Sequence, residues 1–315
     1  MTEPEKINRT GNAMKNVLLT IAYDGTGFCG WQKQPGQRSV QGELERALGI
    51  VCAQPIQLNG TSRTDAGVHA YGQRANFTAE FGIPVEKIPV VVNGIFASAA
   101  SERDRKASGE IAVMAAEEVA ADFHARFDAV GKKYVYKISN SGKPDPFQRN
   151  YRYQVGRKLD LESMKRAAAH LIGTKDFKCF QAAGGKELES TVRTIYGARL
   201  LSAADRGRER FLPSDFGRCL SAAEPEDGLE EDCLEFEIIG DGFLYNMVRI
   251  IAGTLVDVGL GKKHADDIPG IIENRDRRLA GHTAPPQGLY LSEVFYENDG
   301  LHSAAEVING KEIRL

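Results

Sequence analysis

The order of strands and helices predicted from the sequence occurs twice along the chain, and this repetition constrains the fold more than any single motif. Alternating apolar and polar residues predict strands, and apolar residues every three or four positions predict helices. The first half gives strands at Val17–Tyr23, Ile56–Leu58, Gln73–Thr78 and Ile111–Val119, and helices after Ser39 and over Val85–Phe96. The second half gives strands at Lys132–Ile138, Thr194–Leu201, Cys233–Ile239 and Glu293–Tyr296, and helices after Asp160 and over Tyr245–Val258. Two β-α-β-β halves predict a pseudo-duplicated α+β fold whose sheets adjoin.

The length of the chain supports the same division. At 315 residues the chain is long for one hydrophobic core, and this length favours about two domains. We therefore expect a disordered leader at 1–13, an N-terminal α+β domain at 14–127 and a C-terminal α+β domain at 128–315. Two polar stretches, Ala97–Glu110 and Ser202–Asp232, are expected to be exposed loops, the second as an insertion at 202–232.

The composition excludes several classes of protein. The five cysteines are widely spaced and form no Cys-x-x-Cys pair, which argues against a disulfide framework and favours a reducing cytoplasm. No segment approaches the ~18 consecutive apolar residues of a membrane span, and the N-terminus has no apolar targeting run. The six histidines do not cluster with other ligand types, so we expect no metal. A cytoplasmic globular protein without membrane association is the expectation.

One glycine motif could indicate a nucleotide cofactor. Gly25–Gly30 matches G-x-G-x-x-G, the dinucleotide fingerprint. That fingerprint requires a helix to begin at its last glycine, so that the helix N-terminus meets the pyrophosphate. Pro35 and Gly36 follow shortly and break any helix. We therefore expect no nicotinamide or flavin cofactor.

Positive charge is concentrated in one part of the chain. Gly131–His170 contains ten basic and three acidic residues, a net charge of +7, although the whole chain has a net charge of −3. Five aromatic residues are interleaved with these cations: Tyr134, Tyr136, Phe147, Tyr151 and Tyr153. Cations for phosphates and rings for unpaired bases are what an RNA-binding surface needs. From these residues alone, a solvated basic face is an equally good interpretation.

The stretch Asn59–Ala70 combines an arginine, an aspartate, two glycines and a histidine with almost no bulky side chains. It is poorly suited to a core and well suited to a turn, because Asp and Gly favour turns. An exposed Arg63–Asp65 ion pair is the simplest interpretation, since such pairs are common and contribute little to stability. A functional turn is the alternative, and the rest of the chain has to decide between them.

Six short blocks of sequence follow one another between about Val17 and Tyr296. They are Tyr23–Gln34, Arg63–Ala70, Asp122–Phe127, Lys133–Tyr136, Phe243–Arg249 and Ala284–Leu291. In this order they resemble the motifs of the tRNA pseudouridine synthase I family, and six ordered motifs are far harder to obtain by chance than one. The resemblance implies isomerisation of uridine to pseudouridine at positions 38, 39 and 40 of the tRNA anticodon stem-loop, without a cofactor. It also implies a homodimer, no DNA partner, and two ferredoxin-like (RRM-like) halves whose antiparallel sheets meet at a central RNA-binding cleft.

The resemblance also assigns roles to four residues. Asp65 matches the family's catalytic aspartate, and a carboxylate can act as a nucleophile that leaves again when a base is detached and reattached. A carboxylate desolvated against a base needs a nearby cation, and Arg249 matches the arginine that pairs with it. Arg63 resembles the residue that displaces the base and holds the RNA. Tyr134 matches the tyrosine whose ring stacks on the flipped uracil and whose hydroxyl can transfer a proton.

Two alternatives and two departures remain at this point. An RNA-binding module without turnover, and a carboxylate-dependent nucleoside hydrolase, are the alternatives; the hydrolase would need a second acid near Asp65. The sequence leaves open whether Asp65 attacks C6, attacks C1′ or assists a glycal route. Ser62 stands where many family members have glycine, and the two polar loops are longer than usual. The hypothesis requires Asp65 and Arg249 to lie within ion-pair distance.

Overall fold

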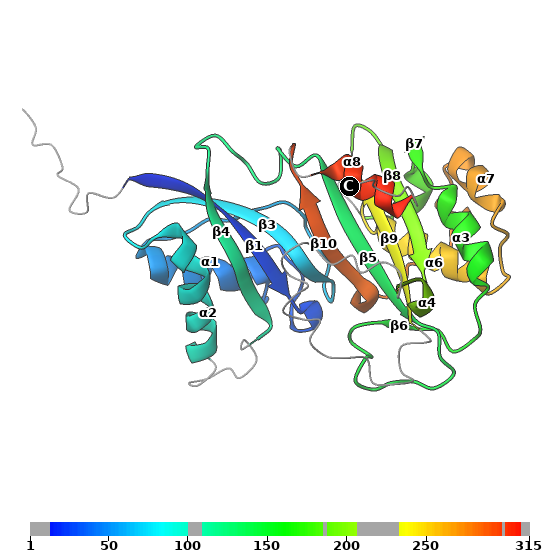
Figure 1. Ribbon diagram of the computed structural model, residues 1–315, viewed down its shortest axis with the longest axis horizontal. Helices are drawn as coiled ribbons and strands as arrows, with labels where there is room; N and C mark the ends of the chain where they lie inside the picture. Colours follow the sequence, from blue (N-terminus) through cyan, green and yellow to red (C-terminus); the bar gives the residue numbers. More distant parts are fainter. Residues whose placement is uncertain (1–12, 100–108, 185–187, 207–232, 298–299, 310–315) are drawn as a thin grey trace, which may run out of the picture. The chain divides into compact units, whose positions relative to one another are not determined.

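The fold is described from a computed structural model, shown in Figure 1. It describes residues 13–99, 109–184, 188–206, 233–297 and 300–309. The chain divides into two compact units: Met1–Thr64 with Gly72–Asp128, and Asp65–Tyr71 with Ala129–Leu315. The N-terminal domain expected at 14–127 includes Asp65, whereas Asp65–Tyr71 groups with the second unit. The physical reason is strand pairing, because the residues that follow the aspartate pair with a strand of the second unit.

Three of the regions expected to lack regular structure are largely outside the described residues. They are the leader at 1–13 apart from Ala13, residues 100–108 of the first polar loop, and residues 207–232 of the insertion. The first polar loop begins later than expected, because a helix extends to Ala99.

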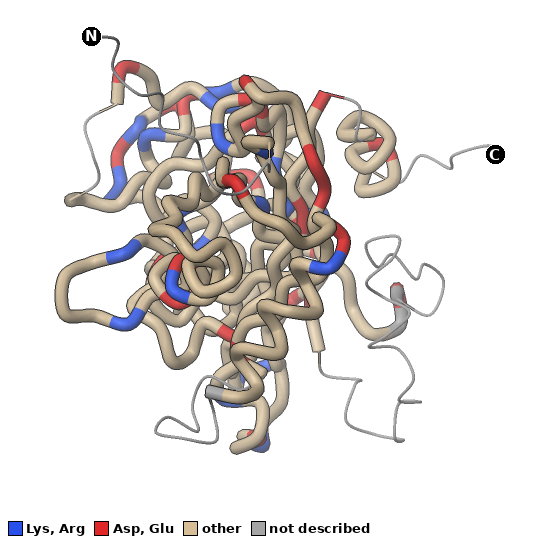
Figure 2. Tube along the Cα trace, turned by 90° about the vertical axis from the view of Figure 1, so that its left-hand side faces the viewer, with Lys and Arg blue, Asp and Glu red and all other residues tan. Residues whose placement is uncertain are grey.

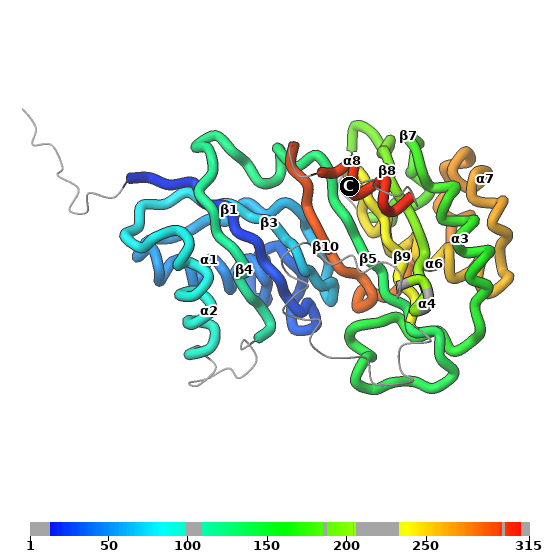
Figure 3. The backbone as a smooth tube through the Cα atoms, in the orientation of Figure 1, coloured from blue at the N-terminus to red at the C-terminus, as the bar shows by residue number. Residues whose placement is uncertain are grey.

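The first unit is a strand layer covered by two helices (Figure 3). Its elements are β1 (Met14–Tyr23), α1 (Val40–Cys52), β2 (Asn59–Gly60), most of β3 (His69–Glu80), α2 (Ile88–Ala99) and β4 (Ile111–Val119). The strand order is β4-β1-β3, with β2 paired to β3. Trp31 is only 1% exposed and packs over Gly60, where a Cβ would lie 2.3 Å from the indole nitrogen. Glycine at this position therefore follows from packing.

Local sequence signals set the ends of the helices in this unit. The Ser39 hydroxyl accepts a hydrogen bond from the Gly42 amide, which caps α1 as predicted. A proline inside a predicted helix usually indicates an interruption, but Pro89 lies in the first turn of α2, where its missing N–H is not needed. The expected strand at Ile56–Leu58 is wrong, since only the two residues of β2 pair there.

The second unit is built on a mixed sheet of longer strands. Its order is the start of β3, then β10-β5-β9-β8-β7, with β6 paired to the end of β5. Its strands are β5 (Gly131–Ser139), β6 (Tyr153–Gln154), β7 (Gly173–Asp176), β8 (Val192–Leu201), β9 (Cys233–Gly240) and β10 (Leu289–Phe295). β10 pairs parallel with His69–Ala70 and antiparallel with β5. The chain as a whole is therefore α+β, as predicted.

Helices cover both faces of this sheet. They are α3 (Leu161–Ala169), α4 (Ala203–Arg206), α6 (Met247–Gly259), α7 (Asp267–Asn274) and α8 (Leu301–Ile308). The register places Tyr134, Tyr136 and Ile138 on one face, together with the β9 residues Phe236 and Ile238. α6 packs against β5 and α3, while α8 lies on the opposite face against Ile239 and Phe295 (Figure 1). The sequence patterns do not predict β6, β7, α4, α7 or α8, which are all short, and α4 lies within the insertion that was expected to begin at residue 202.

α6 is the most enclosed helix of the second unit. Twelve of its residues are buried, although the spacing of its apolar residues alone would predict a single buried stripe. The reason is that α3 packs on one side of α6 and the segment Gly281–Ala284 on another. A Cβ on Gly253 would lie 1.9 Å from the His282 carbonyl oxygen, so this approach requires glycine.

Figure 2 shows Lys and Arg in blue and Asp and Glu in red along the Cα trace, and both signs of charge occur in this view. In the part of the chain that the structure describes, no helix has the length and apolar character needed to cross a membrane.

Candidate active site

Asp65 lies in a tight turn that leads into β3. The Val68 amide donates to the Asp65 carbonyl oxygen at 3.1 Å, which closes the turn. Gly67 has a φ of +78°, and a Cβ there would lie 3.2 Å from a Pro286 ring carbon. Glycine is therefore favoured both by conformation and by this contact. The Asp65 side chain remains 31% exposed, so a substrate can reach it.

Arg249 forms the ion pair that the hypothesis requires. Its Nη1 donates to Oδ2 of Asp65 at 3.3 Å, across 184 residues of sequence. The same nitrogen donates to Oδ1 of Asn246 at 2.8 Å, and Nε donates to the Ala284 carbonyl oxygen at 2.8 Å. The Arg249 side chain is only 15% exposed. Three oxygens therefore hold the guanidinium in one orientation. An ordinary exposed ion pair lacks such additional acceptors.

The backbone around α6 explains how Arg249 is placed. The Ala284 amide donates to the Arg249 carbonyl oxygen at 3.0 Å, and the Gly281 amide donates to the Thr254 hydroxyl at 2.8 Å. These bonds hold the segment before Pro286 along α6. Pro286 is also the residue that contacts Gly67, so one segment meets both the arginine and the aspartate turn.

Tyr134 lies on β5, on the face of the sheet that packs against α6. Its side chain is mostly buried, and its ring meets the ring of Phe243 edge to face, with centroids 5.2 Å apart. Phe243 belongs to the same sequence block as Arg249. The tyrosine thus has a packing partner within the second unit, and its contact with a base stays a prediction.

Arg63 belongs to the first unit and is exposed. Within the described residues it makes no hydrogen bond or ion pair. The simplest interpretation of the sequence, an Arg63–Asp65 surface pair, is therefore wrong, because the partner of Asp65 is Arg249. A role for Arg63 in holding RNA stays a prediction.

Sequence reasoning missed two residues that support Arg249. Asn246 directly precedes α6 with a φ of +59°, and its side-chain oxygen accepts from the guanidinium. Tyr136 donates its hydroxyl to the Pro285 carbonyl oxygen at 2.7 Å, and burial raises the pKa of Tyr136 well above its usual range. The hydroxyl therefore stays protonated and holds the segment beside Arg249. Both residues lie in blocks that the sequence analysis quoted, but only the fold shows their contacts.

Ser62 departs from the family pattern without disturbing the backbone. Its φ is not positive, so glycine is not required at this position. The Gln73 side chain bonds both the amide and the carbonyl of Ser62, at 3.2 and 2.7 Å. The Ser62 hydroxyl, in contrast, is buried and has no hydrogen-bond partner among the residues that the structure describes. An unsatisfied buried hydroxyl destabilises a fold by roughly 1–3 kcal/mol.

We expect Ser62→Ala to raise the free energy of unfolding by about 1 kcal/mol, because it removes the unsatisfied hydroxyl. Urea denaturation measures this change. The matched control is Thr61→Val, since the neighbouring Thr61 hydroxyl lies 2.9 Å from the carbonyl oxygens of both Arg74 and Ala125. Thr61→Val should lower the unfolding free energy by about 1 kcal/mol. Equal destabilisation by both variants would show that the Ser62 hydroxyl has a partner.

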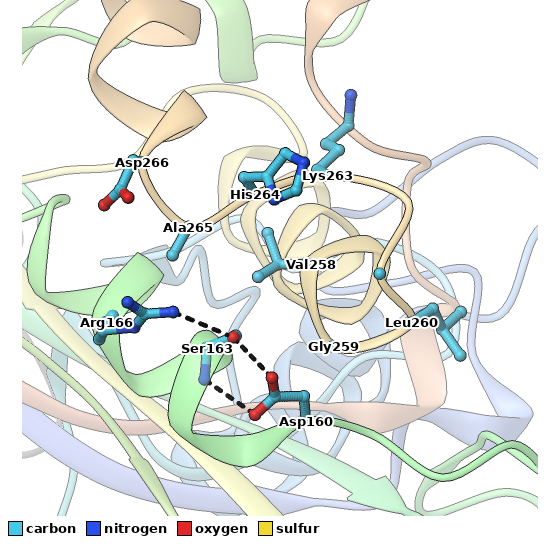
Figure 4. Close-up of a pocket in the computed structure, with 11 residues that line it drawn as sticks. Asp160, Ser163, Arg166, Val258, Gly259, Leu260, Lys263, His264, Ala265 and Asp266 are labelled. Carbon is cyan, nitrogen blue, oxygen red and sulfur yellow. Dashed lines mark hydrogen bonds between the residues drawn. The ribbon is translucent and has the colours of Figure 1, made fainter.

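A polar pocket of about 400 Å³ lies elsewhere in the second unit (Figure 4). It is lined by the start of α3 and by the residues that follow α6, including Asp160, Ser163, Arg166 and Asp266. The Asp160 carboxylate already accepts the Ser163 amide, so the helix N-terminus is satisfied and an anion would meet a carboxylate. The pocket includes none of the four predicted site residues. Within the described ranges, no cluster of three or more His, Cys, Asp or Glu residues could hold a metal.

The fold and the site together define a class: an α+β protein that sets one reachable carboxylate against one arginine held by three oxygens. Comparison with known proteins then specifies the class. The sequence model described as tRNA pseudouridine synthase matches residues 19–128 and 167–297. The chain belongs to the tRNA pseudouridine synthase family. The matched ranges contain Arg63, Asp65 and Arg249, whereas Tyr134 falls between them.

Individual relatives support the same assignment. Proteins named tRNA pseudouridine synthase A from Acetivibrio thermocellus and Caldicellulosiruptor bescii are 44% and 40% identical to the chain. Each alignment covers 90% of this chain and 100% of the relative. A protein from Clostridium tetani named tRNA pseudouridine synthase A 2 is 41% identical over 90% of this chain and 99% of its own length.

Proposed function

We propose that this chain isomerises uridine to pseudouridine at positions 38, 39 and 40 of the tRNA anticodon stem-loop, with Asp65 as the nucleophile. The observation that supports this most directly is the ion pair between Asp65 and Arg249, whose side chain is only 15% exposed. A carboxylate that must react next to an uncharged base needs a fixed positive charge to stay ionised. Arg249 supplies that charge, and its orientation is set by Asn246 and Ala284.

The reaction follows from these groups. The N1–C1′ bond of uridine breaks and a C5–C1′ bond forms, while Asp65 bonds to the substrate and leaves again. The proton lost from C5 is balanced by a proton gained at N1, so the isomerisation consumes no co-reactant. Tyr134 stacks on the uracil once the base has left the helix, and Arg63 holds the displaced strand. Opening a stem uridine costs a few kcal/mol, which binding of the surrounding RNA must offset.

The finer architecture is part of the proposal. We propose that the two units are ferredoxin-like halves related by duplication, and that the protein acts as a cytoplasmic homodimer without a DNA partner. The support is the repeated order of elements and the resemblance of the six sequence blocks to the family. Light scattering coupled to size-exclusion chromatography tests the dimer, and a monomeric mass would contradict it.

Nucleoside analysis of unmodified tRNA after incubation with the protein tests the function. Formation of pseudouridine at one or more of the three positions is expected. Release of free uracil would instead identify a nucleoside hydrolase, and binding without conversion would identify an RNA-binding module. Mapping by carbodiimide modification and primer extension shows which of the positions has been converted.

Arg249→Lys is expected to lower kcat by about 10²-fold with little change in the KM for tRNA. Lysine keeps the charge, but its single ammonium cannot keep the fork of contacts to Asp65, Asn246 and Ala284. Single-turnover kinetics measure this loss. Arg278→Lys is the matched control, because Arg278 is 89% exposed and should tolerate the change. Equal kcat for Arg249→Lys and wild type would contradict an orienting role.

A further inference from the structure

The cations of Gly131–His170, which we call the basic region, differ in whether a carboxylate neutralises them. Lys133 lies 2.9 Å from Glu237, Lys137 lies 3.9 Å from Glu235, and Lys165 lies 3.2 Å from Glu162. A cation that already has a carboxylate partner gains less from a phosphate. These three lysines therefore contribute less to RNA binding than the charge count suggests.

Five other cations of the basic region lie within a single stretch, Ser141–Lys158, which we name the basic segment. They are Lys143, Arg149, Arg152, Arg157 and Lys158, and none forms an ion pair within the described part of the chain. The one carboxylate of the segment, Asp145, accepts the Phe147 amide at 2.8 Å. Phe147 is 82% exposed in this turn. The segment thus presents unneutralised positive charge and an exposed ring together, which suits RNA.

Two aromatic residues of the sheet form hydrogen bonds to the backbone in the middle of the basic segment. Nε2 of His69 lies 2.9 Å from the Asn150 carbonyl oxygen, and the Tyr290 hydroxyl donates to the Tyr151 carbonyl oxygen at 2.8 Å. The rings of His69 and Tyr290 are stacked, with centroids 4.7 Å apart and planes at 19°. Both side chains are at least 95% buried. We name this stacked pair the ring clamp.

The ring clamp continues into neighbouring strands. The Tyr71 ring stacks on Tyr290 with centroids 5.0 Å apart. Nζ of Lys137 donates to the Tyr71 hydroxyl at 2.9 Å and lies 4.6 Å from the Tyr290 ring centroid. The strand register places Tyr290 and Lys137 on the face opposite Tyr134. The Lys137 ammonium lies over stacked rings, where a cation–π attraction adds to the stacking. These contacts restrict the rotamers of Tyr71 and Tyr290.

The position of the clamp links the basic segment to the aspartate turn. His69 is the first residue of β3, directly after the turn that carries Asp65. Tyr290 follows the segment that contacts both Arg249 and Gly67. The other end of the basic segment is also tied, because the Asn140 amide group donates to the carbonyls of Val155 and Arg157 at 3.0 and 2.7 Å.

We propose that the basic segment is a contact surface for the tRNA backbone, and that His69 and Tyr290 are positioning residues that hold it in register with Asp65. This inference rests on the proposed function for the identity of the RNA. Binding to phosphates fixes the orientation of a nucleic acid without reading its sequence. A rigid link between phosphate contacts and the aspartate turn would therefore present the target uridine at a defined place.

Salt-dependent binding tests the contact surface. Every protein carries Asp65→Asn, so turnover does not affect binding of an unmodified tRNA transcript. Lys143→Ala/Arg149→Ala should weaken binding about tenfold and reduce the slope of log K against log salt by roughly 1.4–1.8, the value for two lost phosphate contacts. The control pair is Lys178→Ala/Arg278→Ala, two exposed cations outside the segment. An unchanged slope for the first pair, or an equal loss for both, would overturn the proposal.

Limited trypsin digestion tests the clamp. Tyr290→Phe keeps the stacked ring but removes the hydrogen bond to Tyr151, so cleavage after Arg149 should accelerate by roughly two- to tenfold. Bound tRNA should slow this cleavage in the wild-type protein. A purely structural role would destabilise the whole protein and accelerate cleavage at all sites equally. That result, or no protection by tRNA, would overturn the proposal.

The two proposals fail in different ways. If tRNA binds through the basic segment but no pseudouridine forms, the proposed function fails and the contact surface stands. If pseudouridine forms while the segment variants bind tRNA as tightly as the control pair, the contact surface fails alone.

Discussion

Asp65→Asn is expected to lower the rate of pseudouridine formation by a factor on the order of 10⁴ or more, as removal of an essential group from a covalent mechanism does. The amide has nearly the shape of the carboxylate but cannot act as a nucleophile. Its oxygen can still accept from Arg249 Nη1, which lies 3.3 Å from Oδ2 in the native pair. Single-turnover assays with excess enzyme and unmodified tRNA measure the loss of rate.

Two controls separate loss of chemistry from loss of structure or binding. The tRNA Kd and the urea midpoint of Asp65→Asn should stay close to those of the wild-type protein, because the side chain is partly exposed and keeps its hydrogen bond. Asp276→Asn is a matched substitution at an aspartate outside the site and should leave the rate unchanged. A rate for Asp65→Asn within tenfold of wild type would remove this residue from the nucleophile role.

Glu237→Gln is expected to have the largest effect on stability, a loss of about 3–5 kcal/mol in the free energy of unfolding. Glu237 is 4% exposed on β9 and lies between two cations, Nζ of Lys133 at 2.9 Å and Nε of Arg199 at 2.7 Å. The neutral amide would leave both cations without a counter-charge in a buried place. The control is Glu162→Gln, because the Glu162 side chain is 81% exposed and its pair with Lys165 should contribute less than about 1 kcal/mol.

The same group predicts a dependence on pH. Burial by itself would raise the pKa of Glu237, but the charges of Lys133 and Arg199 outweigh burial and the net pKa lies below its ordinary value. A depressed folded pKa gives stability that is fully present above the unfolded value of about 4.3 and is lost as the pH falls through the folded value. The difference in unfolding free energy between wild type and Glu237→Gln should therefore be constant above about pH 6 and shrink below about pH 4.3. A constant difference down to pH 3 would contradict this assignment.

The main elements of the fold could be predicted from local patterns. Ser39 and Asp160 accept hydrogen bonds at the helix starts where their side chains predict caps. The strand expected at Lys132–Ile138 lies within β5, and period-two alternation accounts for Tyr134 and Tyr136 sharing one face. The elements that were missed are short, and their positions depend on contacts distant in sequence; α8, for example, packs on Ile239 and Phe295. A helix of eight residues has too little periodicity to be identified alone.

The candidate site divides in a similar way between sequence and structure. The sequence by itself determined which residue types could carry the chemistry, because motif order selected Asp65 and Arg249 from many aspartates and arginines. Only the tertiary structure decided that these two side chains meet, since residues 184 positions apart are joined by strand pairing and helix packing, which no local pattern encodes. It also decided which cations of the basic region remain available to a phosphate. That depends on Glu235 and Glu237, which lie far along the chain but directly across the strand pair from β5.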